Sequence, residues 1–297
     1  MEIRSAVIPV AGLGTGLLPS TKSQPKEMLP VGRKPVVQYV VEEFEASGLS
    51  RILFVTGRSK NSIENHFDRD MELIRSLKAA GKHERLEALE YEETRVQFFY
   101  TRQSEPRVLG DAIARAEHFA GNEPFVVGLG DSIIGGNGPV TVAERMIECF
   151  EKNEAACVIA FEEVPRENVS FYGIADPAEE GDVFPIRDLI EKPSVEEAPS
   201  NLAIAARYVL SPVIFDAIRR TQPGKLGEIQ ITDAMRILIE EGHRLYGVKL
   251  VNGERRYDIG NYESYFKTFI DFALSDGKFG GAVEAYLRER LGLSEGE

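Results

Sequence analysis

The chain has 297 residues, of which 43% are hydrophobic and 28% are charged, and its 35 Lys and Arg against 48 Asp and Glu give a net charge of −13. Such an acidic protein is unsuited to general binding of nucleic acids or anionic membranes. No apolar run approaches the roughly 18 residues of a membrane-spanning helix, and residues 1–12 do not resemble a secretion signal. We therefore expect a cytoplasmic protein.

Cysteine and histidine give no sign of a metal or redox site. Cys149 and Cys157 lack the spacing of such sites and are predicted to be reduced core residues. The four histidines are too scattered to suggest a shared metal, and we expect structural or exposed roles for them. They are His66, His83, His118 and His243.

Hydrophobic spacing in the first half of the chain predicts alternating strands and helices. Strands are expected at 5–10, 51–56, 95–100 and 125–129, and helices at 35–47, 69–80 and 109–119. This alternation indicates a mostly parallel sheet that is flanked by helices.

The second half of the chain has fewer helices between its strands. Strands are expected at 155–161, 171–176, 184–190 and 202–210, and helices at 212–220, 232–241, 262–274 and 281–291. The sheet should therefore gain antiparallel pairs after residue 160. Because no repeat or low-complexity linker divides the chain, we predict one α/β domain over residues 1–297 with a mixed, mostly parallel sheet.

Three segments that could carry chemistry directly follow predicted strands. They are the glycine loop at 11–16, the pair Gly130-Asp131, and the segment 257–260. Ligands of open parallel sheets bind beyond the carboxyl ends of the strands. The shared position of these segments therefore predicts one site.

The glycine loop contains Gly12, Gly14 and Gly16, whose backbone N–H groups could converge on phosphate oxygens, although a plain turn after a strand has a similar composition. A Rossmann dinucleotide loop would need a third glycine where this chain has Leu17, and a P-loop would need Lys directly after Gly16. Neither of these two phosphate-binding loops fits.

A basic cluster follows the glycine loop. Lys26 lies between Pro25 and Pro30, which stiffen the loop. Beside a phosphate cradle, this lysine could offset the charge that develops in nucleotidyl transfer. A solvated turn is the alternative for Lys26 and its basic neighbours, which are Lys22, Arg33 and Lys34.

These segments resemble a known family signature. Residues 11–15, followed by Pro19 and by residues 26–30, are similar to the signature of the sugar-1-phosphate nucleotidylyltransferases. Further segments resemble the branch of the bacterial UTP–glucose-1-phosphate uridylyltransferases. They lie at 24–30, 38–43, 65–68, 191–193, 198–201, 207–210 and 227–233, so the resemblance covers roughly residues 3–275.

The resemblance implies a single Rossmann-like nucleotide-diphospho-sugar transferase domain. Its nucleotide-binding half would lie at about 1–135, and its sugar-binding and C-terminal helical part at about 136–297. It also implies uridylyl transfer from UTP to glucose 1-phosphate, giving UDP-glucose and pyrophosphate, with Mg²⁺ as the cofactor. Members of the family are commonly homodimers or homotetramers, and the same is implied here.

The resemblance assigns roles to individual residues. It places nucleotide contacts at Ala11, Gly12, Gly14, Thr15, Gln103 and Gly110, with Gln103 reading an edge of uracil. It places sugar contacts at Gly173, Glu191 and Ala206, and catalytic charge at Lys26, Asp131 and Lys192. Asp131 and Asp258 would hold Mg²⁺, a cation that prefers oxygen ligands.

Simpler interpretations of these charged residues stay open. Asp131 could cap a turn at Ser132. Asp258 could pair with Arg255 or Arg256, and Glu191 and Lys192 could form an ion pair at the end of a strand. The list of charged residues alone does not separate these possibilities from a metal or phosphate site.

Several positions near the expected ligands depart from the family pattern. Gly16 replaces an arginine that normally reaches the triphosphate, and Val108 replaces a glycine beside the base. Asp111 replaces a histidine, Ala206 stands where glycine is common beside the sugar, and residues 128–130 replace a Leu-Pro type of approach to the aspartate.

The missing arginine leaves two hypotheses. A contact that only positions substrate contributes about 1.5–3 kcal/mol, whereas an arginine that stabilises the transition state can change the rate by about 10³–10⁵. Lys22 or Arg107 could compensate for Gly16 in a working uridylyltransferase. The alternative is a weakly active or inactive paralogue that binds nucleotide sugar or regulates an active partner subunit.

Overall fold

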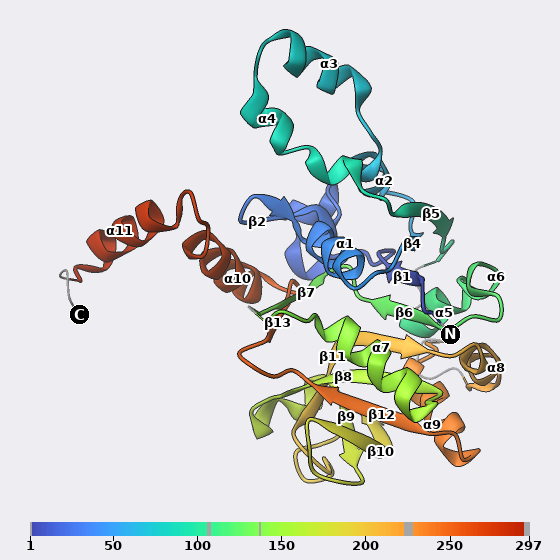
Figure 1. Ribbon diagram of the computed structural model, residues 1–297. Coiled ribbons are helices and arrows are strands. Elements are labelled where there is room, and N and C mark those ends of the chain that lie inside the picture. The colour runs from blue at the N-terminus through green and yellow to red at the C-terminus, as the bar shows by residue number, and fades with distance from the viewer. Residues whose placement is uncertain (1, 106–107, 137, 223–227, 294–297) are drawn as a thin grey trace.

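A mixed nine-stranded sheet forms the centre of the computed structural model, which describes residues 2–105, 108–136, 138–222 and 228–293 (Figure 1). In spatial order the strands are β5 (Gln97–Arg102), β4 (Arg51–Thr56), β1 (Ser5–Pro9), β6 (Phe125–Gly128), β11 (Leu202–Leu210), β8 (Cys157–Glu163), β12 (Leu245–Lys249), β10 (Val183–Glu191) and β9 (Gly173–Pro177). The predicted mixed sheet is confirmed, but four of its eight neighbouring pairs are parallel and four are antiparallel, so it is not mostly parallel.

Parallel pairing holds the first half of the sheet together. β1 pairs in parallel with β4 and β6, and β4 pairs in parallel with β5. β11 then runs antiparallel to both β6 and β8. The antiparallel pairs expected after residue 160 are therefore present, although β12 returns to a parallel pairing with β8.

Two hydrophobic cores pack against the two faces of the sheet, because successive side chains of a strand point to opposite faces. Along β1, Val7 belongs to one core and Ile8 to the other. The core with Ile8 is covered by α1 (Val36–Ala46), α2 (Asn61–Phe67) and α7 (Val142–Asn153). The core with Val7 is covered by α5 (Leu109–Ala114), α8 (Val213–Arg220) and α9 (Ile231–Glu240).

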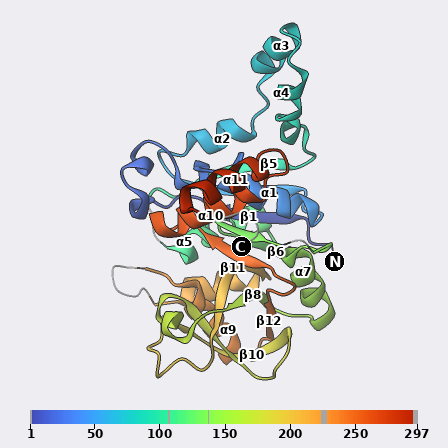
Figure 2. The ribbon, with the colours of Figure 1, turned by 90° about the vertical axis from the view of Figure 1, so that its left-hand side faces the viewer.

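Two small ladders and two helical projections complete the fold. β7 (Ser132–Gly135) pairs antiparallel with β13 (Arg255–Asp258), and β2 (Pro30–Val31) pairs with β3 (Lys34–Pro35). The helices α3 (Met71–Ala79) and α4 (His83–Glu87) project at one end of the molecule, whereas α10 (Tyr262–Leu274) and α11 (Gly280–Leu291) extend from its side (Figures 1 and 2).

The predicted helix at 109–119 is wrong in one respect, because it is divided into α5 and a short α6 (Glu117–Ala120). At the junction, the amide of Ala116 donates to the carbonyl of Ile113 at 2.9 Å, a bond three residues back that tightens the turn. The helices α2, α4 and α7 and the strands β7, β12 and β13 were not predicted.

Cys149 and Cys157 are both buried free cysteines, as predicted. Burial raises the pKa of both thiols and so favours their protonated forms. Within the described part of the chain, no helix is both long enough and apolar enough to cross a membrane.

Candidate active site

A cavity of about 330 Å³ lies beyond the carboxyl ends of three parallel strands. Ala11 and Gly12 line it just after β1, Gln103 lines it after β5, and Asp131 lines it after β6. Lys26 reaches it from the loop that follows the glycines. The structure therefore brings two of the three strand-end segments, the glycine loop and Asp131, into one place.

An ion pair between Lys26 and Asp131 lies in this cavity. The Nζ of Lys26 donates to the Oδ2 of Asp131, and the two side chains are 20% and 18% exposed. Burial disfavours the charge of Lys26, but the Asp131 carboxylate raises the pKa of the ammonium above its ordinary value. The lysine is thus held in its charged form at the wall of the cavity, and Asp131 does more than cap a turn.

A second ion pair, which the sequence did not suggest, lies next to the first in the chain, since Glu27 follows Lys26. Glu27 lines the cavity, and its carboxylate accepts a hydrogen bond from Lys60 at 2.7 Å with both side chains almost fully buried. Burial raises the pKa of Glu27, and Lys60 opposes that shift. Because Lys60 follows β4, the rule that ligands gather beyond strand ends could have pointed to it.

Asp258 is brought beside Asp131 by the ladder of β7 and β13, in which Asp258 lies opposite Ser132. The amide of Ile259 donates to the carbonyl of Asp131 at 3.0 Å, and the hydroxyl of Ser132 donates to Asp258 at 3.4 Å. Burial and the neighbouring Asp131 carboxylate raise the pKa of Asp258 above its ordinary value. Two carboxylates that repel each other in a buried place are suited to a shared cation.

The arginines beside Asp258 have other partners. Arg255 pairs with Asp271 at 3.4 Å, and Arg256 pairs with Glu162 at 2.5 Å. The guanidinium of Arg256 also lies over the ring of Tyr172, 4.9 Å from its centroid. Neither arginine forms an ion pair with Asp258, although Arg256 is near enough to oppose the rise in the pKa of that carboxyl.

The donor set around Asp131 and Asp258 fits Mg²⁺ better than a metal held by protein alone. Among the described residues, no three side chains of His, Cys, Asp and Glu gather into a metal site. Mg²⁺ commonly uses one or two carboxylates and completes its shell with waters and substrate phosphates. Two neighbouring carboxylates, of which that of Asp131 lines the cavity, match that pattern.

The histidines take no part in this arrangement. His66 is hydrogen-bonded to Gln38 at 3.0 Å and stacks on Tyr91, and its burial lowers its pKa to about 4. His83, His118 and His243 are exposed. Their structural or exposed character agrees with the prediction from the sequence.

Gln103 is buried at the wall of the cavity, and two contacts orient it. Its backbone N–H donates to the carbonyl of Thr56 at 2.9 Å, and its side-chain Nε2 donates to Asp111 at 2.6 Å. Val108 lines the same cavity. Asp111 and Val108, the two departures from the family pattern in this segment, therefore contact the proposed base-reading residue or the space beside it.

Three predicted nucleotide residues do not line the cavity. Gly14 has a left-handed backbone with φ of 68°, and its carbonyl accepts a hydrogen bond from Thr21 at 2.6 Å. Thr15 is exposed on the same loop. Gly110 packs against residue 229, where a Cβ would lie 2.3 Å from the carbonyl oxygen of Ile229. The absence of a side chain at Gly110 is therefore explained by packing.

The predicted sugar residues lie farther along the sheet. Gly173 is the register partner of Glu191, whose carboxylate accepts from Thr232 at 3.1 Å instead of pairing with Lys192. A Cβ at Gly173 would lie 2.8 Å from the side chain of Ile204 and 3.1 Å from that carboxylate, so close packing explains the absence of a side chain here. Lys192 is exposed, with a left-handed backbone (φ 48°) held by the carbonyl of Tyr172 at 2.9 Å.

Two departures from the family pattern have structural consequences. Ala206 has φ of 59°, a conformation that glycine adopts more readily, which explains why glycine is common at this position. Gly16 touches the segment after Asp258, because a Cβ at position 16 would lie 2.1 Å from the carbonyl oxygen of Gly260. Any side chain here, arginine included, requires one of the two loops to move.

The chain is similar to proteins of known family along most of its length. Residues 5–273 match the family model described as nucleotidyl transferase. A UTP–glucose-1-phosphate uridylyltransferase from Staphylococcus epidermidis is 41% identical over 289 residues, which are 97% of this chain and 98% of that protein.

Solved structures are similar as well. A UTP-bound UGPase from Acinetobacter baumannii superposes with a TM-score of 0.89 at 35% identity, covering 97% of this chain and 99% of that one. A UDP-glucose pyrophosphorylase complexed with UDP-glucose has a TM-score of 0.82 at 38% identity, covering 93% and 100% of the two chains.

The contact between Gly16 and Gly260 makes a prediction about stability. We expect Gly16→Ala to lower the free energy of unfolding by about 1–3 kcal/mol, because the added Cβ forces a backbone shift. Urea unfolding measures the change. Gly277→Ala is the matched control, since a Cβ there meets nothing within 4 Å. Equal stability of the two variants would contradict the contact.

Proposed function

The chain belongs to the nucleotidyl transferase family, and we propose that it transfers a uridylyl group from UTP to glucose 1-phosphate, giving UDP-glucose and pyrophosphate. The observation that carries this proposal is the cavity at the strand ends, which combines the glycine loop, Gln103 and the Lys26–Asp131 pair. The residues that line the cavity all lie between 9 and 131, which supports a nucleotide-binding half at about 1–135.

The reaction needs the two substrates to be aligned and their charges to be compensated, and it needs no covalent enzyme intermediate. A phosphate oxygen of glucose 1-phosphate attacks the α-phosphorus of UTP in line. The bond from that phosphorus to the oxygen bridging the α- and β-phosphates breaks, and pyrophosphate leaves with the electron pair. Because both reactants are anions, the protein must hold them together against their repulsion.

Lys26 is the proposed residue that meets the α-phosphate, since it is charged, partly buried and held beside the glycine loop. Gln103 would read an edge of uracil in the orientation that Asp111 sets. Glu191 and Gly173 would accommodate the glucose hydroxyls beside Ala206. Exposed Lys192, on its left-handed backbone, would reach the phosphate of the sugar.

Asp131 and Asp258 are the proposed ligands of Mg²⁺. When bound, this ion offsets phosphate charge and orients phosphate oxygens. The pairing of Lys26 with Asp131 places a lysine against one of the two carboxylates, so the ammonium would turn toward phosphate when a cation arrives. The proposed substrates and the two buried free cysteines support a cytoplasmic location.

One observation favours the alternative of weak catalysis. Among the described residues that line the cavity, Lys26 is the sole basic side chain. Lys22 is exposed and does not line the cavity, and Arg107 lies outside the described residues. A paralogue that binds nucleotide sugar with little turnover would have this composition.

The release of pyrophosphate from UTP and glucose 1-phosphate with Mg²⁺ separates these possibilities. We expect turnover in the parent chain, with UDP-glucose as the second product. Asp131→Asn should lower kcat by at least about 100-fold, because it removes a proposed ligand of the cation that would offset the charge of the reacting phosphates. Asp271→Asn is a matched control at an exposed pair with Arg255 and should keep kcat within twofold. Binding of UDP-glucose without turnover in the parent would favour the paralogue.

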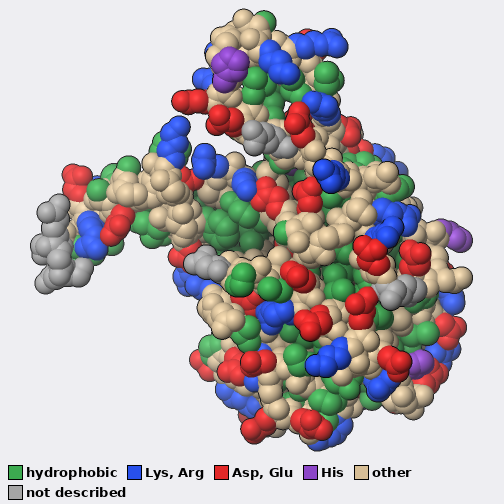
Figure 3. Space-filling model, in the orientation of Figure 1, with side chains coloured by type: hydrophobic (Ala, Val, Ile, Leu, Met, Phe, Trp, Pro, Cys, Tyr) green, Lys and Arg blue, Asp and Glu red, His purple; other side chains and the backbone are tan. Residues whose placement is uncertain are grey.

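We also propose that the chain is a homodimer or homotetramer that is assembled through α10 and α11. Of the residues in α11, Gly280 alone is buried, and a helix of this length is marginal in water by itself. Large apolar side chains along both helices are exposed, and α10 and α11 extend away from the rest of the molecule (Figure 3). They include Phe266 on α10 and Tyr286 and Leu291 on α11, and Phe279, which directly precedes α11, is exposed as well. A second copy would cover them.

The mass of the particle in solution tests this assembly. Sedimentation of the parent chain should give a dimer or tetramer at micromolar concentration. Introducing charge with Tyr286→Asp and Leu291→Asp together should dissociate it, because both side chains are more than half exposed here and would be buried in an interface. Val183→Asp alters an exposed apolar residue on β10 and should leave the mass unchanged. A monomeric parent would overturn the proposal.

A further inference from the structure

Two segments that the sequence singled out, and to which the proposed reaction assigns no role, meet inside the protein. Glu43 on α1 and Arg207 on β11 form a buried ion pair, with side chains 10% and 0% exposed. The Nη2 of Arg207 donates to Glu43 at 2.7 Å and the Nε donates at 3.1 Å, so the contact has two parallel bonds. Such bidentate pairs fix the guanidinium plane.

The remaining donors of Arg207 point toward the active site. Its Nη2 also donates to the carbonyl of Ser132 at 3.0 Å, and its Nη1 donates to the carbonyl of Ala206 at 3.1 Å. Ser132 directly follows Asp131, and Ala206 is the proposed sugar contact. One guanidinium therefore joins the backbone beside a proposed metal ligand to the backbone of the sugar side.

The turn that carries Asp131 is fixed from several directions. The amide of Leu129 donates to the carbonyl of Ala206 at 3.2 Å, and the amide of Ser132 donates to the carbonyl of Leu129 at 3.2 Å. The carbonyl of Asp131 itself accepts from Ile259. Arg207 adds the bond at the carbonyl of Ser132, which is the first residue of β7.

Gly128 makes room for this arrangement. A Cβ at position 128 would lie 2.5 Å from the ring of Phe44 and 3.3 Å from the Cδ of Arg207. The guanidinium lies 5.7 Å from the centroid of the same ring. The departure from the family pattern at residue 128 is therefore coupled to the packing of Arg207 and Phe44.

Stability alone does not explain this pair. Replacing a buried ion pair by apolar side chains of similar volume is often neutral or stabilising, because desolvation of the two charges offsets their attraction. Apolar side chains cannot donate to carbonyls. A variant with apolar residues at these two positions would therefore lose the bonds that hold the turn in its geometry. Misplacement of reacting groups by about 1 Å can lower a rate by roughly 100-fold.

We propose that Arg207, oriented by Glu43, is a positioning residue that holds the Asp131–Ser132 turn and the Ala206 carbonyl in the arrangement needed for nucleotidyl transfer. This inference rests on the proposed function. It assigns to Arg207 an effect on the transfer step rather than on substrate affinity, since the guanidinium is fully buried and reaches the site only through backbone carbonyls.

The test compares apolar and charged replacements. In Glu43→Leu with Arg207→Met, we expect kcat to fall roughly 10- to 100-fold, while KM for UTP stays within threefold. Half-maximal activation should need more Mg²⁺. Arg207→Lys keeps the charge but cannot reproduce the planar fork, so its kcat should fall between that of the parent and that of the double variant.

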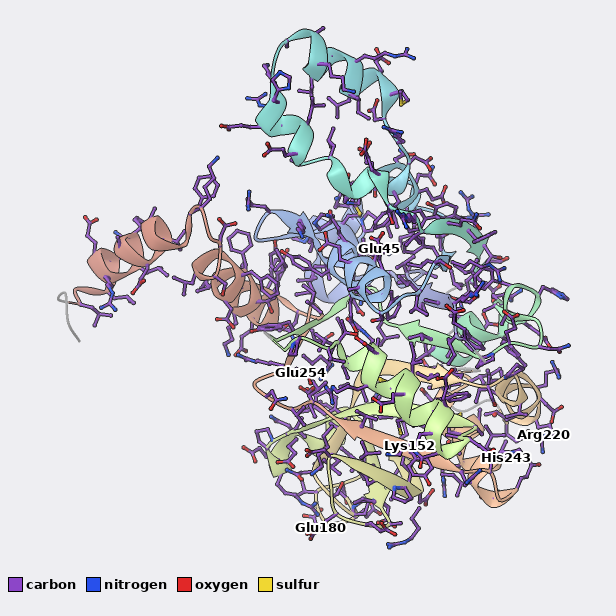
Figure 4. The ribbon with its side chains drawn as sticks, viewed as in Figure 1. Glu45, Lys152, Glu180, Arg220, His243 and Glu254 are labelled. Atoms are coloured by element: carbon purple, nitrogen blue, oxygen red, sulfur yellow. The ribbon has the colours of Figure 1, made fainter. Side chains whose placement is uncertain are left out.

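A matched control is the pair of Arg145 on α7 with Glu254, which lies beside α7 before β13 (Figure 4). These side chains are 23% and 8% exposed, and Arg145 likewise donates to a carbonyl, that of Lys249 at 3.0 Å. Glu254→Leu with Arg145→Met should change the melting temperature about as much as the test pair, with kcat within twofold of the parent.

Hydrogen exchange of the backbone amides at 129–135 gives a second measurement that needs no turnover. Exchange at this segment should rise in Arg207→Lys and in the double variant and stay unchanged in the control pair. Should the parent show no turnover, the proposed function fails, and exchange alone then decides whether Arg207 holds the turn. Unchanged kcat and unchanged exchange in both test variants would overturn the positioning role.

Discussion

The pairing of β7 with β13 is the constraint on which the site depends. It sets Asp258 opposite Ser132 and lets Ile259 donate to the carbonyl of Asp131, so two half-buried carboxylates from distant parts of the chain lie close together. Their mutual repulsion and burial raise the pKa of Asp258. Positive charge placed between the two carboxylates, from a lysine or from a cation, would relieve this repulsion.

Lysine side chains around the site neutralise its carboxylates in separate ion pairs. Lys26 meets Asp131 within the cavity, and Lys60 neutralises Glu27, the neighbour of Lys26 in the chain. Because Glu27 already has a partner, Lys26 is left for Asp131 and for phosphate. Each ion pair joins segments that lie far apart in sequence, so the fold and the charge pattern of the cavity depend on one another.

Much of the fold could be predicted from the sequence. Strands β1, β4 and β11 lie almost where hydrophobic runs placed them. The rule that ligands gather at strand ends grouped Ala11 with Asp131, whereas Gln103 was indicated only by the family resemblance. α7 escaped prediction because its buried face consists of only Val142, Ala143, Met146 and Cys149 among charged residues. The division of 109–119 into two helices depends on a local bond that periodicity does not reveal.

The long-range ion pairs could not be predicted in the same way. Nothing local to Glu43 indicates that it is buried, and the position of Lys60 after β4 points to the site but not to its partner Glu27. Each of these residues has its partner in a segment that only the tertiary fold brings near. In the sequence, Gly16 indicated a loss of activity and Gly128 was part of a departure from the family pattern. In the structure both avoid contacts that a Cβ would make, with Gly260 and with Phe44.

Asp131 and Asp258 should together hold a cation beside the nucleotide. Calorimetry with the full chain and UTP tests this by measuring the binding of Mn²⁺, a probe for Mg²⁺. We expect Asp258→Asn to weaken this binding at least about tenfold, or 1.4 kcal/mol, and Asp271→Asn to leave it unchanged. Equal Mn²⁺ affinity in the parent and in Asp258→Asn would contradict the claim.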